Sequence, residues 1–113
     1  MIYLHNPRCS KSREGLELLE KKKLNPEVIE YLKYPLTEEE LLDIFKAYEG
    51  EISDLIRTKE EIYKELKLDS KTLDQKSLAR VIAKNPILLE RPILINGDKA
   101  AVGRPIEKLL KII

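Results

Sequence analysis

The sequence predicts an α/β fold in which a mixed sheet is flanked by helices. An apolar run, a helical pattern and a second apolar run follow one another within the first 32 residues. The middle of the chain is helical, and its end contains a hairpin signal followed by an amphipathic segment. The tight strand–helix–strand order indicates a parallel pair with a right-handed crossover. We therefore expect a single domain over 1–113, ordered β-α-β, a helical insert over 37–85, and β-β-α.

The first unit begins with an apolar run at 2–4, which predicts a short buried strand. The pattern over 10–23 is helical, and three lysines close it where cations stabilise the negative end of a helix. After the break at Asn25-Pro26, residues 28–32 predict a second strand that Pro35 stops.

The insert contains several helical patterns. Thr37 and Glu40 form a capping box that opens an amphipathic helix ending near Gly50. The pattern over 52–68 is weaker and is typical of two short helical pieces. Asp74 is expected to cap a further helix.

The last unit returns to strands. Residues 91–95 predict a strand, Asn96-Gly97 is a strong hairpin signal, and 100–102 complete the pair. Apolar residues over 106–113 predict a final amphipathic helix, with Pro105 near its first turn.

Composition excludes several classes of protein. The chain has 36% charged and 42% hydrophobic residues, which is typical of a globular domain. A net charge of +1 is too small to indicate a nucleic-acid-binding protein. The sequence shows no signal peptide and no apolar run long enough for a membrane span, and one cysteine cannot form an internal disulfide. We expect a cytoplasmic monomer.

Cys9 is the candidate nucleophile. It stands at the start of the first predicted helix, where unpaired N–H groups lower a thiol's pKa and favour the thiolate. Arg8, Lys11 and Arg13 add positive charge nearby. A small buried cysteine is the plain alternative, but the cationic surroundings favour a reactive, anion-binding turn.

Arginine is used sparingly: the chain has 15 lysines and 6 arginines. Because guanidinium offers a rigid fork of donors to an oxyanion, the arginines outside helix surfaces are candidate ligands. Arg80 lies on a polar helix face and is expected to be solvated. A phosphatase-type loop would need an arginine six residues after Cys9, where Gly15 stands, so that class fails on spacing.

Five segments in order along the chain carry a more specific similarity. They are His5-Asn6-Pro7-x-Cys9-x-x-Ser12-Arg13, Tyr31-Leu32-x-x-Pro35-x-Thr37, Leu55-Ile56-Arg57, Asn85-Pro86-Ile87-Leu88-Leu89-Glu90-Arg91-Pro92-Ile93 and Gly103-Arg104-Pro105. Together they resemble the glutaredoxin-coupled arsenate reductase (ArsC) family, which has a thioredoxin-like fold and also contains the Spx-type transcription regulators.

The resemblance implies a role for each matching residue. Cys9 corresponds to the nucleophile that attacks arsenate, and His5 to a histidine beside it that supports the thiolate. Pro92 corresponds to the cis-proline of thioredoxin-like folds. We expect Ser12 to cap the first helix rather than to hydrogen-bond the sulfur, and Arg13 to contribute general electrostatics. No metal site is expected, because no cluster of ligands surrounds His5. The residues that correspond to the oxyanion-binding arginines are Arg57, Arg91 and Arg104.

The expected function is reduction of arsenate or a similar oxyanion through a thiol–arsenate adduct on Cys9. Without a second cysteine, the resemblance implies external glutathione and glutaredoxin as reductants, with no bound cofactor. One alternative is an Spx-type regulator that binds RNA polymerase, although Ser12 replaces the second cysteine usual there. Another is a glutathione-dependent thiol oxidoreductase with a different substrate. Ser10 stands where arsenate reductases of this family often carry glycine, which weakens the assignment of arsenate as substrate.

Overall fold

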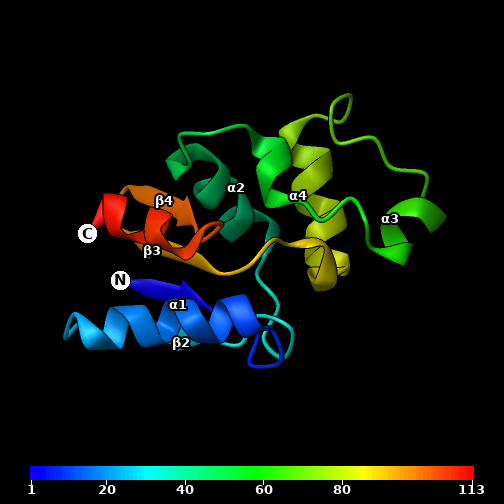
Figure 1. Ribbon diagram of the computed structural model, residues 1–113. Helices are drawn as coiled ribbons and strands as arrows, with labels where there is room; N and C mark the ends of the chain where they lie inside the picture. Colours follow the sequence, from blue (N-terminus) through cyan, green and yellow to red (C-terminus); the bar gives the residue numbers. More distant parts are fainter.

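A four-stranded mixed sheet lies between two groups of helices in the computed structural model, which describes residues 1–113 (Figure 1). The strand order is β2-β1-β3-β4. β1 pairs parallel with β2 and antiparallel with β3, which in turn pairs antiparallel with β4. The strands are β1 (Ile2–Leu4), β2 (Glu27–Ile29), β3 (Ile93–Asn96) and β4 (Lys99–Val102).

Alternating side chains divide the core between the two faces of the sheet. Tyr3 and Leu94 pack with Leu19 of α1 (Ser10–Lys21) and Leu109 of η3, a 3₁₀ helix over Ile106–Ile112. Their neighbours Leu4 and Ile93 belong to a 15-residue cluster on the other face. Because successive strand residues point to opposite faces, β1 and β3 each contribute to both layers.

The larger cluster is covered by α2 (Glu38–Ala47) and α4 (Gln75–Lys84) (Figure 1). Both helices begin as the sequence predicts. The Thr37 hydroxyl accepts from the Glu40 N–H (3.1 Å) while the Glu40 carboxylate accepts from the Thr37 N–H (2.9 Å), a complete capping box. The Asp74 carboxylate caps α4 by accepting from the Ser77 N–H (2.7 Å). No helix combines the length and apolar character that crossing a bilayer requires.

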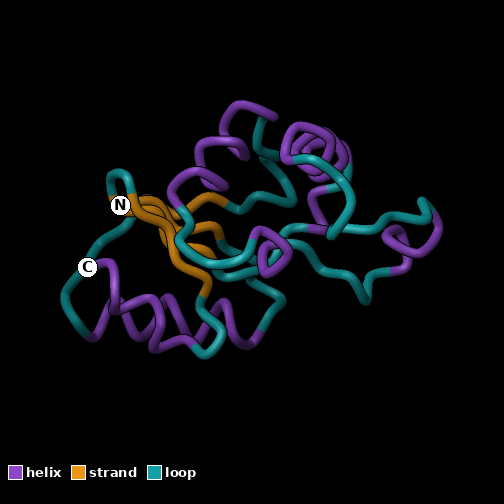
Figure 2. The backbone as a smooth tube through the Cα atoms, turned by 90° about the horizontal axis from the view of Figure 1, so that it is seen from above, coloured by secondary structure: helices purple, strands orange, loops and turns teal.

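The segment predicted as two short helical pieces contains η1 (Ile52–Leu55) and α3 (Glu61–Glu65). α3 lies at the end of the molecule farthest from the strands (Figures 1 and 2). Between the two pieces, the Arg57 N–H donates to the Leu88 carbonyl (2.7 Å) and the Glu90 N–H donates to the Leu55 carbonyl (2.8 Å). This short antiparallel bridge ties the insert to the chain just before β3.

Two predicted boundaries in the first unit are wrong. α1 ends at Lys21 rather than residue 23, because the chain turns through a left-handed conformation at Lys23 (φ 61°). β2 covers Glu27–Ile29 rather than 28–32. The Glu30 carbonyl accepts from the N–H groups of Lys33 and Tyr34 (3.0 Å each), so the chain leaves the sheet in a turn.

The end of the chain also differs in detail. Asn96 pairs with Lys99, so the hairpin loop is Gly97-Asp98, one residue later than predicted. Gly97 has φ +60°, which glycine adopts without steric cost. The final segment is the 3₁₀ helix η3 rather than an α-helix, and Pro105 precedes it as its N-cap.

Gly103 allows a close approach beneath the start of β3. A Cβ at this position would lie 2.7 Å from Pro92 Cγ and 3.2 Å from Leu109. The Gly103 N–H donates to the Pro92 carbonyl (2.9 Å). The Arg91–Pro92 peptide bond is cis, as the resemblance implied, and so is Arg104–Pro105.

We expect Gly103→Ala to lower the free energy of unfolding by about 1–3 kcal/mol, because buried Pro92 and Leu109 must move to admit the methyl group. Gly50→Ala is the matched control, since its Cβ meets only the outer end of the Tyr48 ring, which can move at the expense of its hydrogen bond to Asp54. The control should lose less stability than Gly103→Ala, at most about 1 kcal/mol, the scale of that hydrogen bond. Urea denaturation of both variants measures the difference, and equal losses would contradict the argument.

Candidate active site

The sheet register brings three distant parts of the chain to one edge. Cys9 follows the carboxyl end of β1, and the pairing of Leu4 with Ile93 places the start of β3 beside that end. Val102, at the end of β4, also pairs with Ile93, so Arg104 emerges next to Arg91. The nucleophile predicted from sequence and two of the predicted arginines therefore share one edge.

Cys9 occupies the N-cap position of α1 in an extended conformation (φ −93°, ψ 122°) and is half-buried. Its N–H donates to the Asn6 carbonyl (3.0 Å), and its own carbonyl accepts from the Arg13 N–H (3.0 Å). The Asn6 side chain accepts from the Arg8 N–H (3.1 Å), which closes the turn. The sequence prediction that Cys9 stands at a helix N-terminus is confirmed.

This environment favours the thiolate. Burial alone would raise the pKa of the Cys9 thiol, but the Ser12 N–H, the Arg91 guanidinium and the Lys11 N–H outweigh it, so the pKa lies below its ordinary value. The sulfur accepts no helix-capping hydrogen bond of standard geometry. The two N–H groups therefore act mainly through the partial positive charge of a helix N-terminus.

Arg104 also approaches the sulfur. Its Nη2 lies 3.8 Å from Cys9 Sγ, while its Nε donates to the Arg91 carbonyl (3.0 Å). The second contact fixes the guanidinium plane, so that one edge is held by backbone and the other faces the thiol.

Arg91 supplies donors that the protein does not use. Its Nε and Nη1 are buried and have no hydrogen-bond partner. Leaving charged donors buried without an acceptor is unfavourable. Such an arrangement suits an anion that binds beside the sulfur.

Arg57 is held by carboxylates rather than free. Its Nη1 donates to Glu90 Oε1 (2.8 Å) and its Nε to Glu60 Oε1 (3.2 Å). Burial opposes the charge of Arg57, but these two carboxylates raise its pKa above the ordinary value. The bridge between η1 and the chain before β3 brings Arg57 to this edge.

Glu90 is the residue that sequence reasoning missed. Its Oε1 accepts from Arg57 and from the Arg91 N–H (3.1 Å), and it lies 3.6 Å from Arg104 Nη2. One carboxylate thus joins all three predicted oxyanion-binding arginines. The sequence signal that could have identified Glu90 is its position directly before Arg91, as the first charged residue after an apolar run.

The side chains of Ser12 and His5 are hydrogen-bonded to each other, and neither side chain is hydrogen-bonded to the Cys9 sulfur. Ser12 Oγ accepts from the Asn6 N–H (2.9 Å) and is joined to His5 Nδ1 by a hydrogen bond of 2.7 Å. The prediction that Ser12 caps α1 is wrong, because Cys9 holds the cap position and Ser12 lies three residues into the helix. Burial lowers the pKa of His5, with Arg13 adding to this effect and Glu30 opposing it.

These contacts anchor α1 to β1. The Tyr3 hydroxyl donates to the Ser12 carbonyl (2.6 Å), so Ser12 is held through both its side chain and its backbone. The side-chain hydrogen bond of His5 goes to Ser12 and not to Cys9.

The other basic residues lie on the surface. Arg13 is exposed and donates from Nη1 to the Pro7 carbonyl (2.9 Å), across the turn that carries Cys9. Arg80 is exposed and lies 3.5 Å from Glu38, in agreement with its predicted solvated position.

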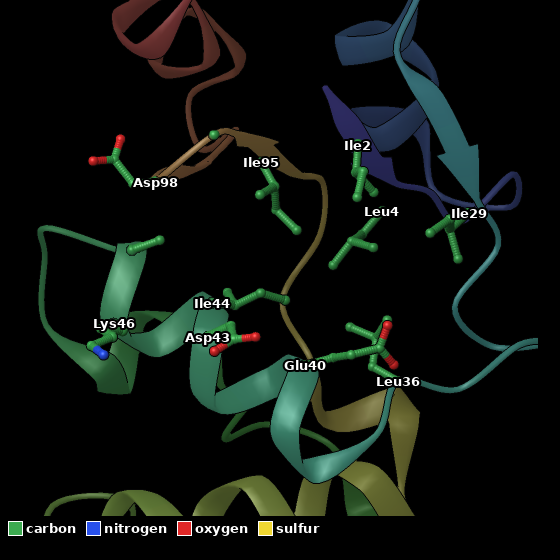
Figure 3. Close-up of a pocket in the computed structure, with 12 residues that line it drawn as sticks. Ile2, Leu4, Ile29, Leu36, Glu40, Asp43, Ile44, Lys46, Ile95 and Asp98 are labelled. Atoms are coloured by element: carbon green, nitrogen blue, oxygen red, sulfur yellow. The ribbon is translucent and has the colours of Figure 1, made fainter.

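A cavity of about 680 Å³ lies elsewhere, between α2 and the face of the sheet opposite α1 (Figure 3). None of the site residues predicted from sequence lines it. Its apolar walls come mainly from the strands and its charged rim mainly from α2. The labelled side chains are Ile2, Leu4, Ile29, Leu36, Glu40, Asp43, Ile44, Lys46, Ile95 and Asp98. No group of three or more potential metal-ligating side chains gathers anywhere in the structure.

The fold and the site define a thioredoxin-like protein with a single thiol in an arginine-rich edge of its sheet. Within that class the chain belongs to the ArsC family, whose family model matches residues 4–112.

Known proteins support this placement. The chain is 50% identical over 106 residues to an arsenate reductase of Neisseria meningitidis serogroup A, covering 93% of this chain and 91% of that protein. It is 44% identical over 110 residues to the uncharacterized protein YfgD of Escherichia coli, covering 96% and 92%. The solved structure of an arsenate reductase from Vibrio cholerae superposes with a TM-score of 0.92 at 42% identity, covering 99% of this chain and 96% of that one.

We expect Arg91→Ala to raise the pKa of the Cys9 thiol, because Arg91 stabilises the thiolate. The thiolate fraction near pH 7 then falls, and alkylation by iodoacetamide should slow roughly tenfold at that pH, the scale of one nearby unit charge. At a pH where both thiols are ionised, the two rates should converge. Arg80→Ala is the control and should keep the wild-type pH profile; an unchanged profile for Arg91→Ala would contradict the assignment.

We expect Glu90→Gln to make the site more positive and to favour anionic thiol reagents. The ratio of the Cys9 rate with dianionic Ellman's reagent to its rate with neutral iodoacetamide should rise about threefold or more. Glu60→Gln removes the other carboxylate on Arg57 but leaves Arg91 and Arg104 untouched. Equal ratios in the two variants would show that Glu90 affects the charge around Cys9 no more than Glu60 does.

Proposed function

We propose that the protein is an arsenate reductase in which Cys9 is the nucleophile and Arg91 and Arg104 bind the oxyanion. The unpartnered buried donors of Arg91, beside a thiol that Arg104 reaches at 3.8 Å, are the observation that carries this proposal. Relatives that bear the name arsenate reductase and cover nearly the whole chain support the choice of substrate.

In the first step the Cys9 thiolate attacks the arsenic of hydrogen arsenate. An S–As bond forms and an As–O bond breaks, and the departing oxygen takes up a proton to leave as water; arsenic remains pentavalent. Because an anion attacks an anion, positive charge must offset their repulsion. Arg91, Arg104 and the N-terminus of α1 supply it, while Arg57 reaches the site through Glu90.

In the second step a glutathione thiolate attacks the Cys9 sulfur. The S–As bond breaks and its electron pair passes to arsenic, which leaves as trivalent arsenite, while Cys9 and glutathione become a mixed disulfide. The chain has no second cysteine to resolve this disulfide. Glutaredoxin then attacks the glutathione sulfur and releases the Cys9 thiolate.

One observation favours a second candidate, a glutathione-dependent thiol oxidoreductase with a substrate other than an oxyanion. Arg57 is already paired with Glu60 and Glu90, which leaves less positive charge for an oxyanion than three free arginines would. A disulfide substrate carries no charge at its sulfur atoms and would leave the Arg91 donors idle.

We expect arsenate-dependent NADPH oxidation with the protein, glutathione, glutaredoxin and glutathione reductase, and its complete loss in Cys9→Ser. A wild-type rate in Cys9→Ser would refute covalent catalysis by this residue. If the wild-type protein gave no arsenate-dependent rate but accepted glutathione disulfide, the second candidate would replace the first.

Arginine variants separate the two candidates further. Arg91→Ala and Arg104→Ala should each lower kcat/KM for arsenate by about a hundredfold, because each loses a charge-assisted hydrogen bond to the transition state. The same variants should change the rate with the mixed disulfide of glutathione and cysteamine, which has no net charge near pH 7, far less. Equal losses on both substrates would show that the arginines serve the thiol and not an oxyanion.

A further inference from the structure

Tyr31 lies at the edge of the sheet that carries Cys9. It follows the carboxyl end of β2 by two residues, and the His5 N–H donates to the Ile29 carbonyl (2.9 Å), which joins the ends of the two parallel strands. The residue is 1% exposed, and its ring belongs to the larger core cluster together with Leu55 and Leu89. The ring is therefore fixed between the sheet and the insert.

The Tyr31 hydroxyl is buried and has no hydrogen-bond partner. This distinguishes it from the other tyrosine hydroxyls in or near the core. Tyr3 donates to the Ser12 carbonyl, Tyr48 to the Asp54 carboxylate, and Tyr63 accepts from the Ser70 N–H. Because buried hydroxyls normally find a partner, an unpartnered one at a candidate site indicates a role in binding.

The charged groups around this hydroxyl are those of the site. Burial raises the pKa of Tyr31 to about 12; Arg91 and Arg57 oppose the rise, and Cys9 and Glu90 add to it. The phenol is therefore neutral near pH 7 and available as a donor. Nε and Nη1 of Arg91 are buried without a partner as well, so three unused donors come from two residues that act on one another electrostatically.

We propose that Tyr31 is a substrate-binding residue whose hydroxyl donates a hydrogen bond to a tetrahedral oxyanion held beside Cys9 by Arg91 and Arg104. The identity of the ligand as an oxyanion rests on the proposed function. A neutral donor suits this place, because Glu90 already offsets part of the arginine charge and a phenol adds a bond without adding charge.

The first test measures oxyanion binding without turnover. Sulfate that occupies the site should slow the alkylation of Cys9 by neutral iodoacetamide, and the concentration dependence gives an apparent Kd; arsenate is the second probe, and its protection also includes any adduct formed on Cys9. Tyr31→Phe should weaken protection by sulfate, and by arsenate, roughly tenfold or more, the scale of a hydrogen bond to a charged group. Tyr48→Phe is the matched control: it also loses one phenolic oxygen, but its partner Asp54 lies outside the site.

The second test uses the sign of the change in stability. Because the Tyr31 hydroxyl has no partner in the protein, removing it should leave the melting temperature unchanged or raise it. Tyr48→Phe loses the bond to Asp54 and should melt lower or at the wild-type temperature, with unchanged protection. Weaker protection together with a melting temperature no lower than wild type is the signature of a binding role.

The outcomes separate this inference from the reductase proposal. If Tyr31→Phe protects Cys9 as well as the wild type does, or loses protection only in proportion to lost stability, Tyr31 is a structural residue and the inference is overturned. Protection that depends on Tyr31 in a protein unable to reduce arsenate would uphold the inference and reject the reductase. If neither anion protects wild-type Cys9, the oxyanion site itself is absent, and both the Tyr31 inference and the reductase proposal are overturned.

Discussion

The antiparallel pairing of β3 with β1 and with β4 is the constraint on which the site depends. Cys9, Arg91 and Arg104 are far apart in the chain and meet only because Ile93 pairs with both Leu4 and Val102. A slip of one residue in β3 would exchange Leu94 and Ile93 between the two faces of the sheet and rotate Arg91 away from the thiol. The side chains buried on both faces therefore fix the register of β3, and this register brings Cys9, Arg91 and Arg104 to one edge of the sheet.

Charge balance at this edge follows from the same geometry. Three guanidinium groups close together repel one another unless an anion lies among them. Glu90 is that anion in the folded chain, because it contacts Arg57, the Arg91 backbone and Arg104 with a single oxygen. It leaves the side-chain donors of Arg91 unused, and these lie beside a thiol whose pKa is already lowered. The proposed function assigns these donors to one further anion.

Local signals in the sequence predicted much of the fold. The capping residues Thr37 and Asp74 act as expected, and Cys9 starts the first helix as its surroundings indicated. The errors fall where tertiary contacts override local pattern. Residues 30–32, predicted as the end of the second strand, instead enter a turn toward the insert, and the last segment forms a 3₁₀ helix against the sheet instead of an α-helix.

The sequence by itself determined the order of elements, the candidate nucleophile and, through the family resemblance, the arginines to examine, because each of these is carried by residues close together in the chain. Only the tertiary structure decided how those residues are used. It paired Arg57 with Glu90, bound Ser12 to His5 rather than to the helix end, and left the Tyr31 hydroxyl buried without a partner. Contacts such as the Arg57–Glu90 hydrogen bond, between residues 33 positions apart, depend on strand register and side-chain burial, and no local pattern encodes them.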